Sequence, residues 1–450
     1  MDTILPNPAG RKDSLEQDPP GWKSREVRLG VVMYGGVSLA IYIYGVAQEL
    51  FRAVRGRGVY KLIKTLTDSD IVVDAISGTS AGGINGILLA YALCNERDFS
   101  SASTLWRVDG DIRRMLRSPR GSITESTSLL DSTAYYQPRL EMAFRDMASY
   151  TPEEGEDPSE FSELDLFVTG THFHGNFYTQ FDDAGHPINV KDHRSVFLLK
   201  HRKGRKEPFN PQPSYDPSAN PETTYTALAK LARITSCFPA AFEPVRVERV
   251  AENDPTADAK LRQWGKLESD QHTYFLDGGV LDNKPFTYTL KAIFSRTADR
   301  AVDRNLLYIE PDPGAETAVQ SVDASNPNLV QTVLASLIGI PGYESISDDL
   351  KLLAERNSKL EQYNRLMGNL QPECMPQSRT LARQGASPPS PLASTLYERS
   401  RLVFISDRVI EGLFKHGGQH DRIAPEEREK ASNLVRKFDD LFNHNTSDIF

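Results

Sequence analysis

Hydrophobic runs that alternate with glycine-rich turns are the main pattern in the first part of the chain. Two largely apolar runs of strand length, at 27–33 and 71–75, each lead through small residues into an apolar stretch of helical length. Such runs are typical of parallel strands that are buried on both faces. The repeated order of strand, turn and helix therefore predicts an α/β protein and the start of a doubly wound sheet over 27–93.

Further alternating and periodic stretches follow. Residues 164–200 alternate apolar and polar positions around a turn at 182–186, which predicts a β-hairpin. We expect a helix at 225–236 and a last core strand at 306–310. Residues 95–160 are polar and helical in pattern, so they form an insertion between core elements that either covers the site as a lid or supports the sheet.

Composition divides the chain into segments. Residues 1–26 are polar, carry four prolines and have no apolar segment, so we expect a disordered arm rather than a signal peptide. The range 27–310 is the expected catalytic domain, and the 3.6-residue periodicity at 329–338 and 345–367 predicts a C-terminal helical extension over 311–367. Residues 368–394 are rich in proline and predict a linker or loop. Amphipathic helices are expected over 395–450.

The strongest chemical signal is a Gly-Thr-Ser-Ala-Gly sequence between the second predicted strand and its helix. A Gly-x-Ser-x-Gly at such a turn is the pattern of a nucleophile elbow, which presents its serine beside a helix N-terminus. The flanking glycines let neighbouring backbone pass closely. A serine hydroxyl is a weak nucleophile, so it also needs a base and oxyanion donors. The elbow residues are Gly78, Thr79, Ser80, Ala81 and Gly82.

Candidates for the base and the oxyanion donors lie at the ends of other predicted strands. Asp277 ends an apolar strand, and Gly278 and Gly279 follow it with little bulk around the carboxylate. The strand at 27–33 leads into a glycine loop before a predicted helix. Backbone N–H groups in such a loop are suitable donors to an oxyanion. The loop donors would come from Gly35, Gly36 and Val37.

Along the chain, the glycine loop comes first, the elbow second and the Asp-Gly-Gly segment third. Together they resemble the patatin-like phospholipase family. The resemblance extends over roughly 27–310 and includes further matches at 235–244 and 166–171. It implies a three-layer α/β/α fold with a mostly parallel central sheet. It also implies a Ser–Asp dyad without histidine, in which Ser80 is the nucleophile and Asp277 the base. The implied activity is phospholipase A-type hydrolysis of phospholipids or other acyl-ester lipids through an acyl-serine, without a metal or organic cofactor.

The oxyanion loop departs from the family pattern Gly-Gly-Gly-x-Arg/Lys-Gly. Tyr34, Ser38 and Leu39 replace the first glycine, the basic residue and the last glycine. Backbone donors survive these replacements because side chains do not supply them, whereas the positive side chain is lost. Two alternatives therefore stay open: a soluble carboxylesterase or transacylase on the same dyad, and a catalytically silent binding module.

Histidine-based alternatives are less favoured. An α/β-hydrolase triad needs a histidine after the acid, and the three that follow Asp277 lie in polar sequence far downstream. They are His416, His420 and His444. His172 and His174 have strand spacing, but no acidic or cysteine ligand accompanies them at a suitable spacing for a metal. We expect these two side chains to lie together on an exposed strand face.

Charge and cysteine content restrict the remaining partners. The net charge is −9 over 450 residues, which argues against nucleic-acid binding. The basic run 200–206 is expected in a solvated loop and is the candidate for peripheral membrane contact. The three cysteines form neither a disulfide framework nor a zinc pattern. Without a stretch that could span a bilayer, the sequence predicts a cytoplasmic protein that reaches lipid peripherally, and it leaves the oligomeric state open.

Overall fold

The computed structural model divides into one unit that ends at Ile346 and a second that spans Ser347–Phe450. Within the second unit it describes one helix, at 349–362. Three predicted segments lie outside the described residues: the arm up to residue 22, the linker at 368–394 and the C-terminal helices at 395–450. The structure describes residues 23–36, 40–117, 128–150, 163–181, 186–203, 208–211, 219–251, 254–267, 272–298, 300–310 and 349–362.

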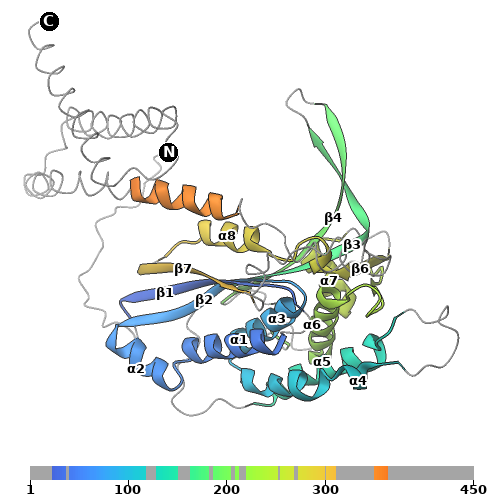
Figure 1. Cartoon of the computed structure of the whole chain (residues 1–450), viewed down its shortest axis with the longest axis horizontal. Coiled ribbons are helices and arrows are strands. Elements are labelled where there is room, and N and C mark those ends of the chain that lie inside the picture. The colour runs from blue at the N-terminus through green and yellow to red at the C-terminus, as the bar shows by residue number, and fades with distance from the viewer. Residues whose placement is uncertain are drawn as a thin grey trace, which may run out of the picture. The chain divides into compact units, whose positions relative to one another are not determined.

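A seven-stranded sheet forms the centre of the first unit (Figure 1). Its hydrogen-bonded order is β5-β6-β3-β2-β1-β7, with β4 paired to β3. The β7-β1-β2-β3 part is parallel, whereas β4, β5 and β6 join through antiparallel pairs. The strands are β1 (Arg25–Met33), β2 (Ser69–Gly78), β3 (Glu163–Phe181), β4 (Pro187–Arg202), β5 (Val245–Val247), β6 (Thr273–Asp277) and β7 (Ala301–Ile309).

Helices cover the two faces of this sheet, with α1 and α3 on one face and α8 on the other (Figure 1). The predicted α/β class with three layers is therefore confirmed, and the sheet is mixed rather than mostly parallel. The α-helices are α1 (Ala40–Val54), α2 (Val59–Leu66), α3 (Ala81–Cys94), α4 (Ile112–Met115), α5 (Gln137–Ala148), α6 (Pro221–Ser236), α7 (Ala257–Gly265) and α8 (Phe286–Phe294).

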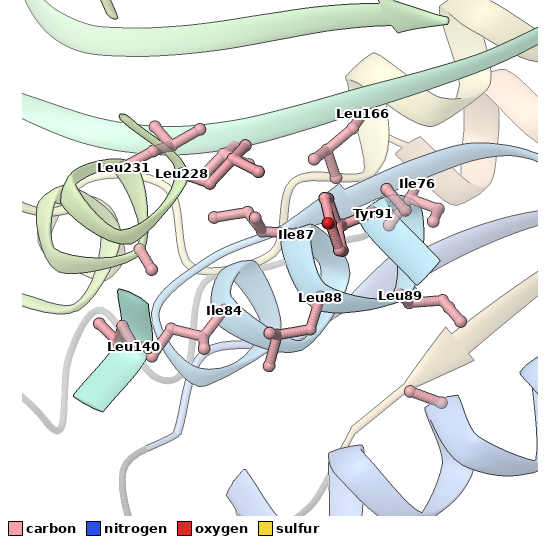
Figure 2. Close-up of a cluster of buried hydrophobic side chains, with 14 of the residues drawn as sticks. Ile76, Ile84, Ile87, Leu88, Leu89, Tyr91, Leu140, Leu166, Leu228 and Leu231 are labelled. Carbon is pink, nitrogen blue, oxygen red and sulfur yellow. The ribbon is translucent and has the colours of Figure 1, made fainter. Parts of the chain in front are cut away.

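Helix α3 lies in the middle of the core. Residues 81–93 are buried on every side of the helix, which is why its sequence is apolar without an amphipathic stripe. Figure 2 shows its side chains between α6, α5 and the strands β2 and β3. Leu228 and Leu231 of α6 and Leu166 of β3 belong to this cluster. The packing fixes the start of α3, where the sequence places the elbow.

The described part of the 95–160 insertion is helical, as predicted. Its longest helix, α5, buries Leu140, Phe144 and Met147 completely. A helix with a fully buried apolar face supports the fold and cannot swing away from it without exposing that face. Helix α5 is therefore a packing element of the fold, and the lid stays a prediction.

Strands β3 and β4 continue past the other strands as a two-stranded ribbon (Figure 1), which confirms the predicted hairpin. Gly78, the last residue of β2, pairs with Val168, so the ribbon extends from the edge of the sheet that carries the elbow. Phe173, Phe177 and Phe181 of the ribbon are more than half exposed, at 52%, 67% and 67%.

The basic run at 200–206 begins as strand rather than loop, which corrects the expectation. Arg202 ends β4, where its guanidinium binds Asp165 at 2.7 Å. The register pairs Arg202 with Glu163 at the start of β3, so the described part of the run lies at the sheet edge opposite the elbow. A contact made there would turn the elbow away from a membrane. Of the helices within the described ranges, none combines the length and apolarity needed to cross a bilayer.

Candidate active site

Ser80 lies at the turn between β2 and α3 in an unusual backbone conformation. Its φ of 52° and ψ of −123° fall outside the regions that a non-glycine residue prefers. Such strain persists only where surrounding structure holds it, and it is typical of a nucleophile elbow. The Ser80 N–H donates to the Thr235 hydroxyl at 2.9 Å, and its carbonyl accepts from the Ile84 N–H at 3.0 Å. These two bonds hold the turn.

Asp277 lies at the end of β6, where the antiparallel pairing with β3 sets it opposite Gly170. The Ser80 hydroxyl donates to one carboxylate oxygen of Asp277, with an Oγ–Oδ2 distance of 3.0 Å. The other oxygen accepts the Gly279 N–H at 2.7 Å. Both side chains are buried, with Ser80 6% and Asp277 2% exposed. The sheet thus brings together two residues that lie 197 positions apart.

Burial raises the pKa of Asp277 to about 7, although the hydrogen bonds from Gly279 and Ser80 oppose this rise. Water stabilises a carboxylate better than a buried site does, so the neutral form gains. A pKa close to neutral is suited to a group that takes up and returns a proton near pH 7.

The glycine loop after β1 passes directly over Ser80. Tyr34 donates its N–H to the Ile309 carbonyl at 3.1 Å, and Gly35 donates to the Asn283 carbonyl at 3.4 Å. A Cβ at Gly35 would lie 3.3 Å from the Ser80 Cβ and only 2.2 Å from Asn283 Oδ1. A side chain there would require the Asn283 side chain or the loop to shift.

The expected set of oxyanion donors changes in the structure. The Gly35 N–H is directed at Asn283, and Val37 lies outside the described residues. The Ser80 N–H is used by Thr235. Two N–H groups remain candidates: that of Gly36, the next residue of the loop, and that of Ala81, which lies in the first turn of α3, where amides lack an intrahelical acceptor.

Two glycines of the motifs are required by close backbone approach. A Cβ at Gly82 would lie 2.4 Å from the Met33 carbonyl oxygen, so this glycine lets the end of β1 approach the elbow. A Cβ at Gly278 would lie 2.2 Å from the Thr169 hydroxyl, so Gly278 lets β3 pass beside the Asp277 strand. The hydroxyl of Thr169, a residue of β3, in turn shares a 2.7 Å hydrogen bond with the hydroxyl of the elbow residue Thr79.

Sequence reasoning missed three polar residues that hold this site: Thr235, Asn283 and Asn85. A signal existed for Asn85, since an amide within an otherwise apolar helix needs buried partners. Thr235 begins the family match at 235–244 and Asn283 lies four residues after Gly279, but their hydrogen bonds depend on contacts between distant segments.

The prediction for the histidine pair was wrong. His172 is buried and packs edge-on against Phe275, with ring centroids 5.5 Å apart, whereas His174 is exposed. Burial lowers the pKa of His172. Within the described ranges, no group of three or more histidine, cysteine, aspartate or glutamate residues is arranged to hold a metal ion. The three late histidines, His416, His420 and His444, fall beyond the described residues.

An α/β sheet that sets a strained serine turn in hydrogen-bond contact with a buried aspartate has the arrangement expected of a serine hydrolase fold. The profile of the patatin-like phospholipase family matches residues 31–290, which is more than half of the chain. The chain belongs to this family, as its motifs indicate, and the matched range includes Ser80 and Asp277.

The chain is also similar to an uncharacterized membrane protein of Mycobacterium tuberculosis, Rv3479. The two are 27% identical over 369 residues, which cover 75% of this chain and 32% of that protein. The chain thus spans about a third of the length of the curated relative that it matches.

Proposed function

We propose that this chain is a lipid acyl hydrolase of the phospholipase A type that uses Ser80 as nucleophile and Asp277 as base. The observation that carries the proposal is the 3.0 Å hydrogen bond between the two side chains at a strained elbow. Membership of the patatin-like phospholipase family supports acyl-ester lipids as the substrate class.

The geometry suits a two-step acyl transfer. Asp277 takes the hydroxyl proton while Ser80 Oγ attacks the ester carbonyl carbon, and the Gly36 and Ala81 N–H groups donate to the oxyanion. The intermediate then expels the lipid alkoxide, which receives the proton from Asp277. Water then attacks the acyl-serine with Asp277 again as base, and the second intermediate breaks the bond to Ser80 Oγ, which receives the proton back from Asp277 as the fatty acid leaves. The one carboxyl group thus takes up and returns a proton in each half of the reaction.

A fluorophosphonate probe tests the nucleophile directly. The wild-type chain should be labelled at Ser80, and Ser80→Ala should not be labelled, whereas a control such as Ser101→Ala should keep labelling. The absence of labelling in a folded wild-type chain would favour the silent binding module. Turnover that depends on an added acyl acceptor would instead favour the transacylase.

We expect turnover to depend on a single ionisation near pH 7. Asp277 acts as a base only when ionised, and its pKa of about 7 leaves it mostly protonated at lower pH. The rate on a soluble ester should be constant above about pH 8 and fall about tenfold per unit below about pH 6. The measurement is kcat/KM between pH 5 and 9. A flat profile down to pH 5 would assign the proton transfer to another group.

We also expect phospholipid hydrolysis to increase when the substrate passes from monomers to micelles or vesicles. The ribbon of β3 and β4, with its exposed phenylalanines, extends from the sheet edge that carries Ser80. A lipid surface that contacts the ribbon would therefore lie at the same edge of the sheet as the active site. Phe177→Ser with Phe181→Ser should lower vesicle hydrolysis about tenfold or more, because two large apolar groups are lost from the interface.

The matched control lies at the opposite sheet edge. Lys200 and Lys203 are exposed there, and replacing both with glutamine should leave vesicle hydrolysis unchanged. All variants should keep wild-type rates on short soluble esters. Equal wild-type rates on monomers and vesicles would favour the soluble carboxylesterase.

A further inference from the structure

Asn85 is a fully buried amide on α3, five residues after Ser80. We propose that Asn85 is a positioning residue that holds the oxyanion loop against the elbow; the inference rests on the function proposed above. Burial of an amide costs free energy unless its donors and acceptor find partners, so a side chain with this burial must have a specific environment.

The hydrogen bonds of Asn85 connect its own helix, α3, with α1 and with the segment that carries Trp106. Its Nδ2 donates to the Ala40 carbonyl at 3.1 Å and to the Ala81 carbonyl at 3.0 Å. Its Oδ1 accepts the indole N–H of Trp106 at 3.0 Å. Both amide hydrogens are therefore used, together with one acceptor position of the oxygen.

These segments carry the two proposed oxyanion donors. Ala40 is the first residue of α1 and follows the glycine loop, only four residues after Gly36. Ala81 supplies the second donor from the first turn of α3. One amide thus bonds to both segments, so Asn85 sets the distance between the end of the loop and the elbow helix.

The other end of the loop is held by different contacts. Tyr34 and Gly35 donate to the carbonyls of Ile309 and Asn283. Without Asn85, the loop would keep this first attachment, and the start of α1 that follows the loop would lose its hydrogen bond to α3. Oxyanion donors act at about 2.7–3.1 Å from the developing charge, and a displacement of about 1 Å can lower the rate on the order of a hundredfold.

Trp106 gives the amide its orientation. Because its indole N–H can only donate, it requires the Asn85 oxygen, and the two N–H groups then point toward Ala40 and Ala81. An amide turned the other way would set a carbonyl oxygen against two carbonyls. Trp106 belongs to the 95–160 insertion, so this contact also connects the insertion with the catalytic core.

The test compares Asn85→Leu with the wild type. Leucine fills a similar volume without the three hydrogen bonds, so kcat on a soluble ester should fall about 10- to 100-fold while KM stays within about twofold. Phosphonylation of Ser80 by a fluorophosphonate should slow in parallel, because its transition state uses the same oxyanion donors. A loss of packing alone would not separate kcat from KM in this way.

If Asn85→Leu does not fold, the variant Trp106→Phe tests the same inference. This variant leaves the amide in place and removes only the partner of its oxygen, so kcat should fall in the same direction by a smaller factor. A folded Asn85→Leu or Trp106→Phe with wild-type kcat would overturn the inference alone. A wild-type chain that shows no turnover dependent on Ser80 would overturn the proposed function, and this inference with it.

Discussion

Replacing Ser80 with alanine or Asp277 with asparagine is expected to abolish ester hydrolysis while leaving the fold intact. The two side chains act as one unit, so each replacement should cost about as much as losing both, on the order of 10³–10⁶ in kcat. The measurement is turnover of a short soluble ester, together with circular dichroism and thermal unfolding of each variant. His172→Ala should retain most activity, and a loss as complete as that of Ser80→Ala would contradict a dyad.

The thermal unfolding of Asp277→Asn provides an independent check. Burial raises the pKa of Asp277 in the folded chain above its unfolded value, so its contribution to stability is fully present below the unfolded pKa. That contribution is lost as the pH rises through about 7, where the buried group ionises. Asparagine can keep both contacts without charge, because its oxygen can accept the Gly279 N–H while its NH2 group donates to the Ser80 hydroxyl oxygen. At pH 8 the variant should therefore unfold at a higher temperature than the wild type.

The second large effect is expected from Gly35→Ala. The added Cβ would lie 2.2 Å from Asn283 Oδ1 and 3.3 Å from the Ser80 Cβ, so the Asn283 side chain or the glycine loop must shift beside the nucleophile. Loss of one oxyanion donor costs about 10²–10³ in kcat. We expect a fall of this size in kcat with a small change in KM.

Gly45→Ala is the matched control for this substitution. Gly45 lies within α1, and a Cβ there would have no atom within 4 Å. Because alanine is favoured over glycine inside a helix, this variant should be as stable as the wild type or slightly more so. An unchanged kcat in a folded Gly35→Ala would exclude the loop after β1 as the source of the oxyanion donor.

The order of elements in the catalytic unit could be predicted from local sequence. The apolar runs at 27–33 and 71–75 became β1 and β2, because residues buried on both faces of a strand leave a continuous apolar pattern. The elbow was recognisable because a serine flanked by glycines between a strand and a helix has few other structural uses. These signals are local, so a single sequence is enough to recognise them.

Helix α2 shows where a local pattern fails. Its apolar residues Val59, Leu62 and Leu66 are exposed in the structure, at 61%, 58% and 75%, while Lys64 is buried. The Lys64 ammonium binds the Val54 carbonyl and the Asp70 carboxylate, and these contacts offset its burial. An inverted arrangement of this kind depends on partners in other segments.

The sequence by itself determined the class of the fold, the family and the identity of the serine and aspartate that stand at strand ends. Only the tertiary structure decided that these two groups meet at 3.0 Å, that Gly35 turns its N–H toward Asn283, and that the described part of the basic run lies at the edge away from the elbow. Strand ends are local features that the hydrophobic pattern of the sequence indicates. Distances between them follow from strand register and from buried hydrogen bonds such as those of Asn85, which join residues that no local pattern connects.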